Sequence, residues 1–296
     1  MGTPARTLAS ALEPVIGAVY FAPEAHAAYV ALGYGDSPAG RGGVAFPDGV
    51  AYATSRGSLL GAANGATVAA AFGVFEPTGI AASVDHGRTI ADAATILAAR
   101  EDAVLALLSR IVGDEAGSEG DRRERAAELL RRAVDGLAPG PRALAAGALV
   151  APVHDHAFGE IFRWGDALRE FRGDSHNAAW AAAGLDACQI GILSELWWGL
   201  PARSYSRTRG WSAEQFDAAV ASLTDDGYLT PEETLSDAGR AFREEIEVAT
   251  DAQMTPVLDR LGSDLDELVA ILEPWGATIR AGHGYPASGP HDLAGQ

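Results

Sequence analysis

Residues 184–250 constrain the fold most, because helix start and stop signals follow one another closely there. Ser212 and Gln215 form a capping-box pair, in which each side chain can satisfy backbone donors of a first helical turn. Gly227 suits the end of the same helix. The predicted elements, in order, are a helix at Leu185–Leu196, a short second helix at Pro201–Arg207, a third helix at Ser212–Asp226, a strand at Tyr228–Thr230, a turn at Pro231–Thr234 and a helix from Ser236. This order is that of a winged helix-turn-helix.

The charge of this segment argues against the function that its layout suggests. The predicted third helix carries Glu214, Asp217, Asp225 and Asp226, and the whole chain has a formal net charge of −18. Both features repel the phosphate backbone of nucleic acid. A few side chains remain for DNA contact, three arginines before the third helix and two neutral residues at its start: Arg203, Arg207, Arg209, Ser212 and Gln215. Nucleic acid is therefore not the expected partner.

Outside this segment the apolar spacing is nearly all helical and predicts a mainly α fold. We expect a helical N-terminal bundle packed on the winged helix-turn-helix, followed by long C-terminal helices. One helix is predicted at Thr89–Ile111. Pro77 is expected to end a helical run, and Gly173 to separate two helices. The predicted divisions are a helical domain at 1–150, connecting helices with a polar cluster at 151–183, the winged helix-turn-helix with the C-terminal helices at 184–280, and a loose tail at 281–296.

Composition favours a cytoplasmic protein. We find no run of about 18 apolar residues, which argues against a membrane span and a membrane partner. The first residues also lack the apolar core of a signal peptide. Cys188 is the single cysteine, so no disulfide can form within the chain, as is usual in a reducing compartment.

The densest cluster of ionisable side chains lies at 154–176. His176 is expected to act as a base or acid near neutral pH, with Asp174 orienting its imidazole and Glu170 as a further catalytic carboxylate. Arginine grips carboxylates and phosphates through paired hydrogen bonds. The predicted substrate-binding residues are Arg169, Arg172, Arg56 and Tyr20. Two interpretations stay open, a site for an anionic small molecule and a network of internal salt bridges between helices.

A metal site is the weaker interpretation of the histidines in this region. His154 and His156 flank a carboxylate, as some zinc and iron ligands do. Such sites need three or four ligands at fixed geometry, and the spacing here does not require a third from His176 or Glu160. His154 and His156 are therefore weak candidates only, and we expect no metal and no cofactor.

Short stretches spread over the chain carry a family resemblance: Tyr20-Phe21-x-Pro23, Ser55-Arg56, Arg169-Glu170-x-Arg172-Gly173-Asp174-x-His176, Arg209-Gly210-Trp211-Ser212 and Leu235-Ser236-Asp237-Ala238-Gly239-Arg240. Together they resemble an uncharacterised actinobacterial helix-turn-helix-like family. The last part alone is similar to the wing and following helix of multiple-antibiotic-resistance-type regulators. The resemblance implies a helix-turn-helix fold and implies no activity.

Three functions compete at this point. In the first, the pocket between the winged helix and the N-terminal helices binds an anionic small molecule, and the protein is an enzyme of specialised metabolism that performs non-redox acid–base chemistry. In the second, it is a ligand-responsive transcription regulator that binds DNA as a homodimer, an interpretation that rests on fold analogy. The third is a helical interaction protein with no ligand, which a filled core at Arg172 and His176 would favour.

Overall fold

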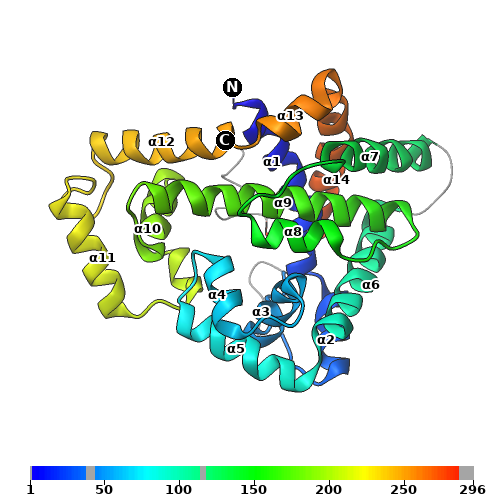
Figure 1. Cartoon of the computed structure of the whole chain (residues 1–296), viewed down its shortest axis with the longest axis horizontal. Helices are drawn as coiled ribbons and strands as arrows, with labels where there is room; N and C mark the ends of the chain where they lie inside the picture. Colours follow the sequence, from blue (N-terminus) through cyan, green and yellow to red (C-terminus); the bar gives the residue numbers. More distant parts are fainter. Residues whose placement is uncertain (1, 38–43, 114–117, 287–296) are drawn as a thin grey trace.

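The structure of the chain is a computed structural model, which describes residues 2–37, 44–113 and 118–286 (Figure 1). The predicted mainly α fold is confirmed. The first helices are α1 (Pro4–Ile16), η1 (Gly17–Tyr20), α2 (Pro23–Leu32), α3 (Gly49–Gly57), η2 (Ser58–Leu60), α4 (Gly65–Phe72), α5 (Pro77–Ile90), α6 (Ala93–Val112), α7 (Ser118–Val134) and α8 (Ala143–Val150). The remainder are α9 (Ala157–Ala182), α10 (Ala187–Trp197), η3 (Ser206–Arg209), α11 (Ala213–Asp225), α12 (Asp237–Ala252), α13 (Thr255–Leu261), η4 (Gly262–Asp264) and α14 (Leu265–Ala281).

The long helix α9 organises the molecule. It packs against α1, α6, α7, α8 and α12, and in Figure 1 it crosses the centre, with α10 near one end and α7 near the other. The sequence predicts a break at Gly173, but α9 runs through this residue for 26 residues in all. Burial of side chains such as Phe162 and Phe171 outweighs the cost of about 1 kcal/mol for a glycine inside a helix. The polar cluster therefore lies on one continuous helix.

Two other helix boundaries differ from the prediction, and capping explains both. Pro77 opens α5 instead of ending a helix, because a proline in the first turn has no hydrogen-bonded amide to lose, and the Glu76 side chain caps that turn. The run predicted at Thr89–Ile111 is divided between α5 and α6. Asp92 starts the second helix by accepting a hydrogen bond of 2.8 Å from the amide of Thr95.

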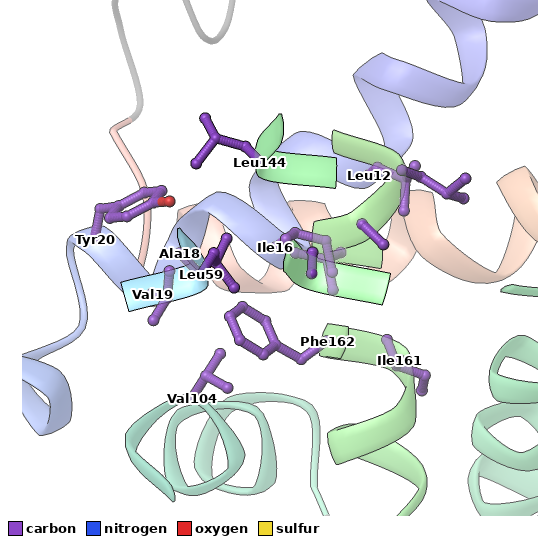
Figure 2. Packing of buried hydrophobic residues seen from close by; sticks show 14 of the residues in the cluster. Leu12, Ile16, Ala18, Val19, Tyr20, Leu59, Val104, Leu144, Ile161 and Phe162 are labelled. Atoms are coloured by element: carbon purple, nitrogen blue, oxygen red, sulfur yellow. The ribbon is translucent and has the colours of Figure 1, made fainter. Parts of the chain in front are cut away.

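Most buried apolar side chains form one main core around α1, α6, α8, α9 and α14. Figure 2 shows Phe162 of α9 facing Val104 of α6, with Val19 and Ile16 beside it. Helices α1 and α9 approach so closely that a Cβ added to Gly165 would lie 2.4 Å from Ile16 Cδ1. A larger residue at position 165 would force the Ile16 side chain to shift.

The C-terminal helices α13 and α14 belong to the same main core, since α14 packs along α1 and buries Trp275 and Ile279. The predicted division places 184–280 together, whereas the buried core groups α13 and α14 with the N-terminal helices. Tyr285 is predicted to lie in a loose tail, but it is fully buried, with its ring centroid 5.3 Å from that of Phe21. The tail prediction is wrong for this residue, and 287–296 lie outside the described residues.

Among the described residues, Pro4–Leu32 is the single stretch long and apolar enough, by length and composition, to cross a membrane. Most of this stretch is buried, and α1, η1 and α2 contribute to the main core. Its apolar character is accounted for by that packing, because a helix buried in a protein core passes the same test as a membrane span.

A smaller core holds α10, α11 and the turn after them: Cys188, Ile192, Leu193, Phe216, Ala219, Val220, Leu223 and Leu229. The capping box is confirmed, because the Gln215 amide donates to Ser212 Oγ at 3.2 Å and the Ser212 amide to Gln215 Oε1 at 2.8 Å. The predicted second helix is wrong, since only the 3-10 turn η3 forms there. The predicted strand reduces to one antiparallel bridge between Leu229 and Leu235.

Two hydrogen bonds attach this segment to the N-terminal helices. The amide of Glu76 donates to the carbonyl of Arg209 at 2.9 Å, and the indole N–H of Trp211 donates to the carbonyl of Val74 at 3.3 Å. Helix α12 packs on α9 nearby. The turn that precedes α11 is thus tied directly to the connection between α4 and α5.

Candidate functional site

A cavity of about 290 Å³, here called the central cavity, lies beside the C-terminal half of α9. Its walls come from α1, α3, α4, α9, α10, η3 and α12. Six arginines line it: Arg6, Arg56, Arg169, Arg172, Arg209 and Arg243. Six aromatic residues line it as well: Tyr52, Phe72, Phe75, Trp197, Trp198 and Tyr205. Pockets that bind small molecules are typically apolar with a few placed polar groups, and this one is unusually rich in guanidinium groups.

Helical spacing determines which residues of the polar cluster reach the central cavity. Positions 169, 172, 173 and 176 are three or four residues apart, so they share one face of α9, and all of them line the cavity. Asp174 lies two positions before His176, on the opposite face. Its carboxylate accepts a hydrogen bond of 3.1 Å from the amide of Ala145, at the start of α8. The predicted orientation of His176 by Asp174 is therefore wrong.

His176 is neutral at physiological pH. Burial disfavours its charged form, and Arg243 and Arg172 repel a further positive charge, so the pKa of His176 falls to about 3. Its Nδ1 lies 3.2 Å from Thr250 Oγ1 of α12. A general base or acid works best with a pKa near the operating pH. This environment suits a histidine that hydrogen-bonds as a neutral ring.

Glu170, the predicted catalytic carboxylate, is held by two arginines that line the cavity. Arg56 donates to it from Nε at 2.9 Å and from Nη2 at 2.6 Å, and Arg169 Nη1 lies 3.2 Å away. Arg169 also donates two bonds to Glu13, at 2.9 and 3.2 Å. Glu170, Arg56 and Arg169 therefore form a salt-bridge network in the wall of the cavity, the structural interpretation that the sequence leaves open.

The remaining predicted anion-binding arginine, Arg172, is paired in the same way. It contacts Glu247 and lies 3.1 Å from Asp251, both on α12. Burial opposes ionisation of Glu247, but Arg172 and Arg243 outweigh it and lower the pKa of this carboxyl to about 2. The ion pair is therefore fully formed at neutral pH. It fixes α12 against α9.

Tyr20, predicted to bind substrate, lies behind the cavity wall and does not line it. Its hydroxyl accepts a hydrogen bond of 3.2 Å from Arg100, which is completely buried and also donates to Asp166. Burial raises the pKa of Tyr20. The phenol is thus part of a buried polar cluster of η1, α6 and α9.

Arg209 is the lining residue whose role differs most from the prediction, which assigns it to DNA contact. Its guanidinium lies over the ring of Phe75, 4.4 Å from the centroid, and over Tyr205 at 4.6 Å, and it donates to the Tyr205 hydroxyl. Arg6 and Arg243 also line the cavity and are absent from the predicted site. Arg6 and Arg243 lie in no motif that the sequence analysis identifies, and the stretch that contains Arg209 does not place it in a cavity. All three residues come from elements far from the polar cluster in sequence.

The other predicted DNA-contacting residues are distributed differently. Arg203 is paired with Asp217 at 2.7 Å and with Glu233 at 3.2 Å, so carboxylates of α11 and of the turn after it neutralise its charge. Ser212 and Gln215 are exposed but hydrogen-bond each other in the capping box. Arg207 is exposed at the turn before α11. The exposed positions of α11 include Glu214, Asp217 and Asp225, so its outer face is acidic.

The two metal candidates lie away from the central cavity. His154 Nε2 is 3.2 Å from Asp102 Oδ1 in an exposed pair, and His156 Nδ1 caps α9 by accepting a bond from the amide of Phe158 at 3.1 Å. Within residues 2–37, 44–113 and 118–286, no three His, Cys, Asp or Glu side chains are grouped so as to hold a metal ion. The residues present around these histidines do not fit a metal centre.

Comparison with known protein families assigns the class that this fold and sequence define. A helix-turn-helix family model matches residues 5–286, nearly the whole chain. The protein therefore belongs to this helix-turn-helix family. No curated protein and no solved structure matches it. The family extends over the helices of the central cavity as well as over α10 and α11.

Proposed function

We propose that the protein is a ligand-responsive DNA-binding regulator whose central cavity binds an anionic small molecule. One observation carries the proposal: α9 and α1 form one side of the cavity, and η3, the turn directly before α11, forms another. A ligand in this space contacts both parts of the molecule. Differential contacts of this kind are what a regulator needs to couple ligand binding to the position of a helix.

The charge of the cavity wall supports an anionic ligand. Six arginines face the cavity, against three glutamates: Glu13, Glu170 and Glu247. Glu244 and Asp251, which do not line the cavity, pair with Arg6 and Arg172 and bring the carboxylates to five, so the six arginines leave an excess of one positive charge in a chain whose net charge is −18. A low-dielectric cavity strengthens the attraction of such a wall for an anion.

DNA binding is tested by fluorescence anisotropy with a labelled duplex from the region upstream of the gene. About 50 mM salt is suitable, because phosphate contacts are strongest at low salt. We expect saturable binding, and we expect Arg207→Gln to weaken it and to reduce the salt slope by about one. Arg240→Gln, an exposed arginine of α12, is the matched control. Absence of wild-type binding at this salt would refute the regulator.

The acidic outer face of α11 favours a second candidate, a small-molecule-binding protein that does not contact DNA. In this case α11 serves as a packing module. An enzyme of specialised metabolism with acid–base chemistry is the specific form of this candidate. Two carboxyls have a pKa raised to about 6, mainly by burial, namely Glu101 and Asp174, and both lie outside the cavity. A pKa of about 3 makes His176 a poor acid–base catalyst near neutral pH.

We also propose that the protein is a cytoplasmic homodimer. Dimeric helix-turn-helix proteins bind paired half-sites on DNA, and the buried, unpaired Cys188 suits a reducing compartment. Light scattering coupled to gel filtration measures the molar mass directly. A mass of one chain at micromolar concentration would contradict the dimer.

A further inference from the structure

Arg209 connects two groups of aromatic rings in the central cavity. Phe75 lies 5.7 Å from Tyr52 and 5.8 Å from Phe72, between ring centroids, and these three rings come from α3, α4 and the residues after α4. Tyr205 lies 5.9 Å from Trp198 on the opposite side, after α10. The guanidinium stacks on one ring of each group. The cation is thus held in position by π faces.

Arg209 also differs from the other five arginines of the cavity in its electrostatic partners. Arg6, Arg56, Arg169, Arg172 and Arg243 each contact at least one carboxylate. Among the described residues, the polar partner of the Arg209 side chain is the phenol of Tyr205, and no carboxylate pairs with it. A guanidinium offers five N–H donors, so most of its donors remain for another acceptor.

We infer that the ligand of this cavity is an aromatic monoanion, with its ring against the aromatic residues of the cavity wall and its anionic oxygens on Arg209. This inference rests on the proposed function, because it specifies the ligand of the same cavity. The arginines of α9 are neutralised by carboxylates. The residue that binds the anionic group of the ligand is therefore Arg209 of η3. Flat rings match the aromatic walls, and a carboxylate or sulfonate matches the guanidinium fork. The bound anion would touch the turn directly before α11.

The test uses two dyes with the same ring system and different charge. The probes are 1-anilinonaphthalene-8-sulfonate and the neutral N-phenyl-1-naphthylamine, and binding is followed by fluorescence. We expect Arg209→Gln to weaken sulfonate binding by about tenfold or more, the effect of losing a charge-assisted hydrogen bond. The neutral dye should change by less than about twofold, since it makes no such bond. Arg240→Gln, the matched control, should change neither affinity.

Two further variants keep the test decisive. Arg209→Met is also uncharged and fills the space between Phe75 and Tyr205 with a flexible apolar chain, so it replaces the glutamine variant if that one does not fold. Ala9→Trp places a large side chain in the cavity wall and should weaken both dyes, which locates their site. Equal effects of the Arg209 variants on both dyes, or no effect on either, would show that Arg209 does not bind the anionic group. The cavity would then remain a ligand site. If wild-type protein binds neither dye, or Ala9→Trp changes neither, the ligand site itself is refuted.

Discussion

The buried pair of Arg100 and Asp166 gives the sharpest test of the energetics, through the substitution Arg100→Met. Both side chains are 0% exposed, and the guanidinium donates to the two carboxylate oxygens at 3.0 and 3.1 Å. Burial opposes ionisation of Asp166, but Arg100 outweighs it, so the pKa of this carboxyl lies below its usual value. After the substitution, the closest paired cation to Asp166 among the described residues is Arg163, at 3.7 Å.

The expected loss of stability follows from the charge left behind. Breaking a buried ion pair by removing one partner costs about 3–5 kcal/mol. Arg163 compensates part of this charge, while the hydrogen bond from Arg100 to the Tyr20 hydroxyl is also lost. We therefore expect Arg100→Met to reduce the free energy of unfolding by about 4 kcal/mol, the middle of that range. Adding Asp166→Leu removes the stranded charge, so the double variant should be more stable than the single one.

Urea denaturation followed by circular dichroism measures both variants. Arg125→Met is the matched control, because Arg125 pairs with Glu128 and Glu267 on the surface, where solvent screens the charges. Arg125→Met should reduce the free energy of unfolding far less than Arg100→Met. The reasoning is refuted if Arg100→Met costs less than about 1 kcal/mol, or if the double variant is less stable than the single one.

His176 should not titrate between pH 5 and 8, because burial and Arg243 lower its pKa to about 3; an imidazole NMR midpoint near 6.5 would contradict this. Burial raises the pKa of Asp174 from 3.8 to about 6, so its contribution to stability is complete below pH 3.8 and is lost as the pH rises through 6. In the Asp174→Asn variant, the urea midpoint should therefore fall less than in the wild type over this pH interval. The same pH profile in variant and wild type would contradict this prediction. Gly165→Ala should cost about 1–3 kcal/mol in thermal melts through its clash with Ile16, and Ile16→Val should restore part of that loss. A fully stable Gly165→Ala would show that the Ile16 side chain can shift at little cost.

Helix starts were the part of the fold most accessible from sequence, because capping is a local interaction. Ser212 and Gln215 satisfy each other within one turn, so this pair marks the start of α11. The break at Asp92 was equally local and could have been found from its capping side chain. The continuity of α9 through Gly173 could not, since it depends on burial against five other helices.

The candidate site was predictable only in part. Arg169, Arg172 and His176 line the central cavity because helical spacing places them on one face of α9. The same spacing argument, applied to Asp174, would have separated it from His176. The pairing of the arginines with carboxylates of α1 and α12, and the position of Arg209 in the cavity, depend on tertiary contacts.

Glu76 gives the molecule a built-in reporter of how firmly the α10–α11 segment is docked. Its carboxylate accepts a bond of 2.6 Å from the amide of Gly79 and so holds α5, while its own amide is bonded to the carbonyl of Arg209. Exchange of this amide hydrogen with deuterium requires the latter bond to open. The exchange rate of this single amide therefore reports how often the turn before α11 separates from the N-terminal helices.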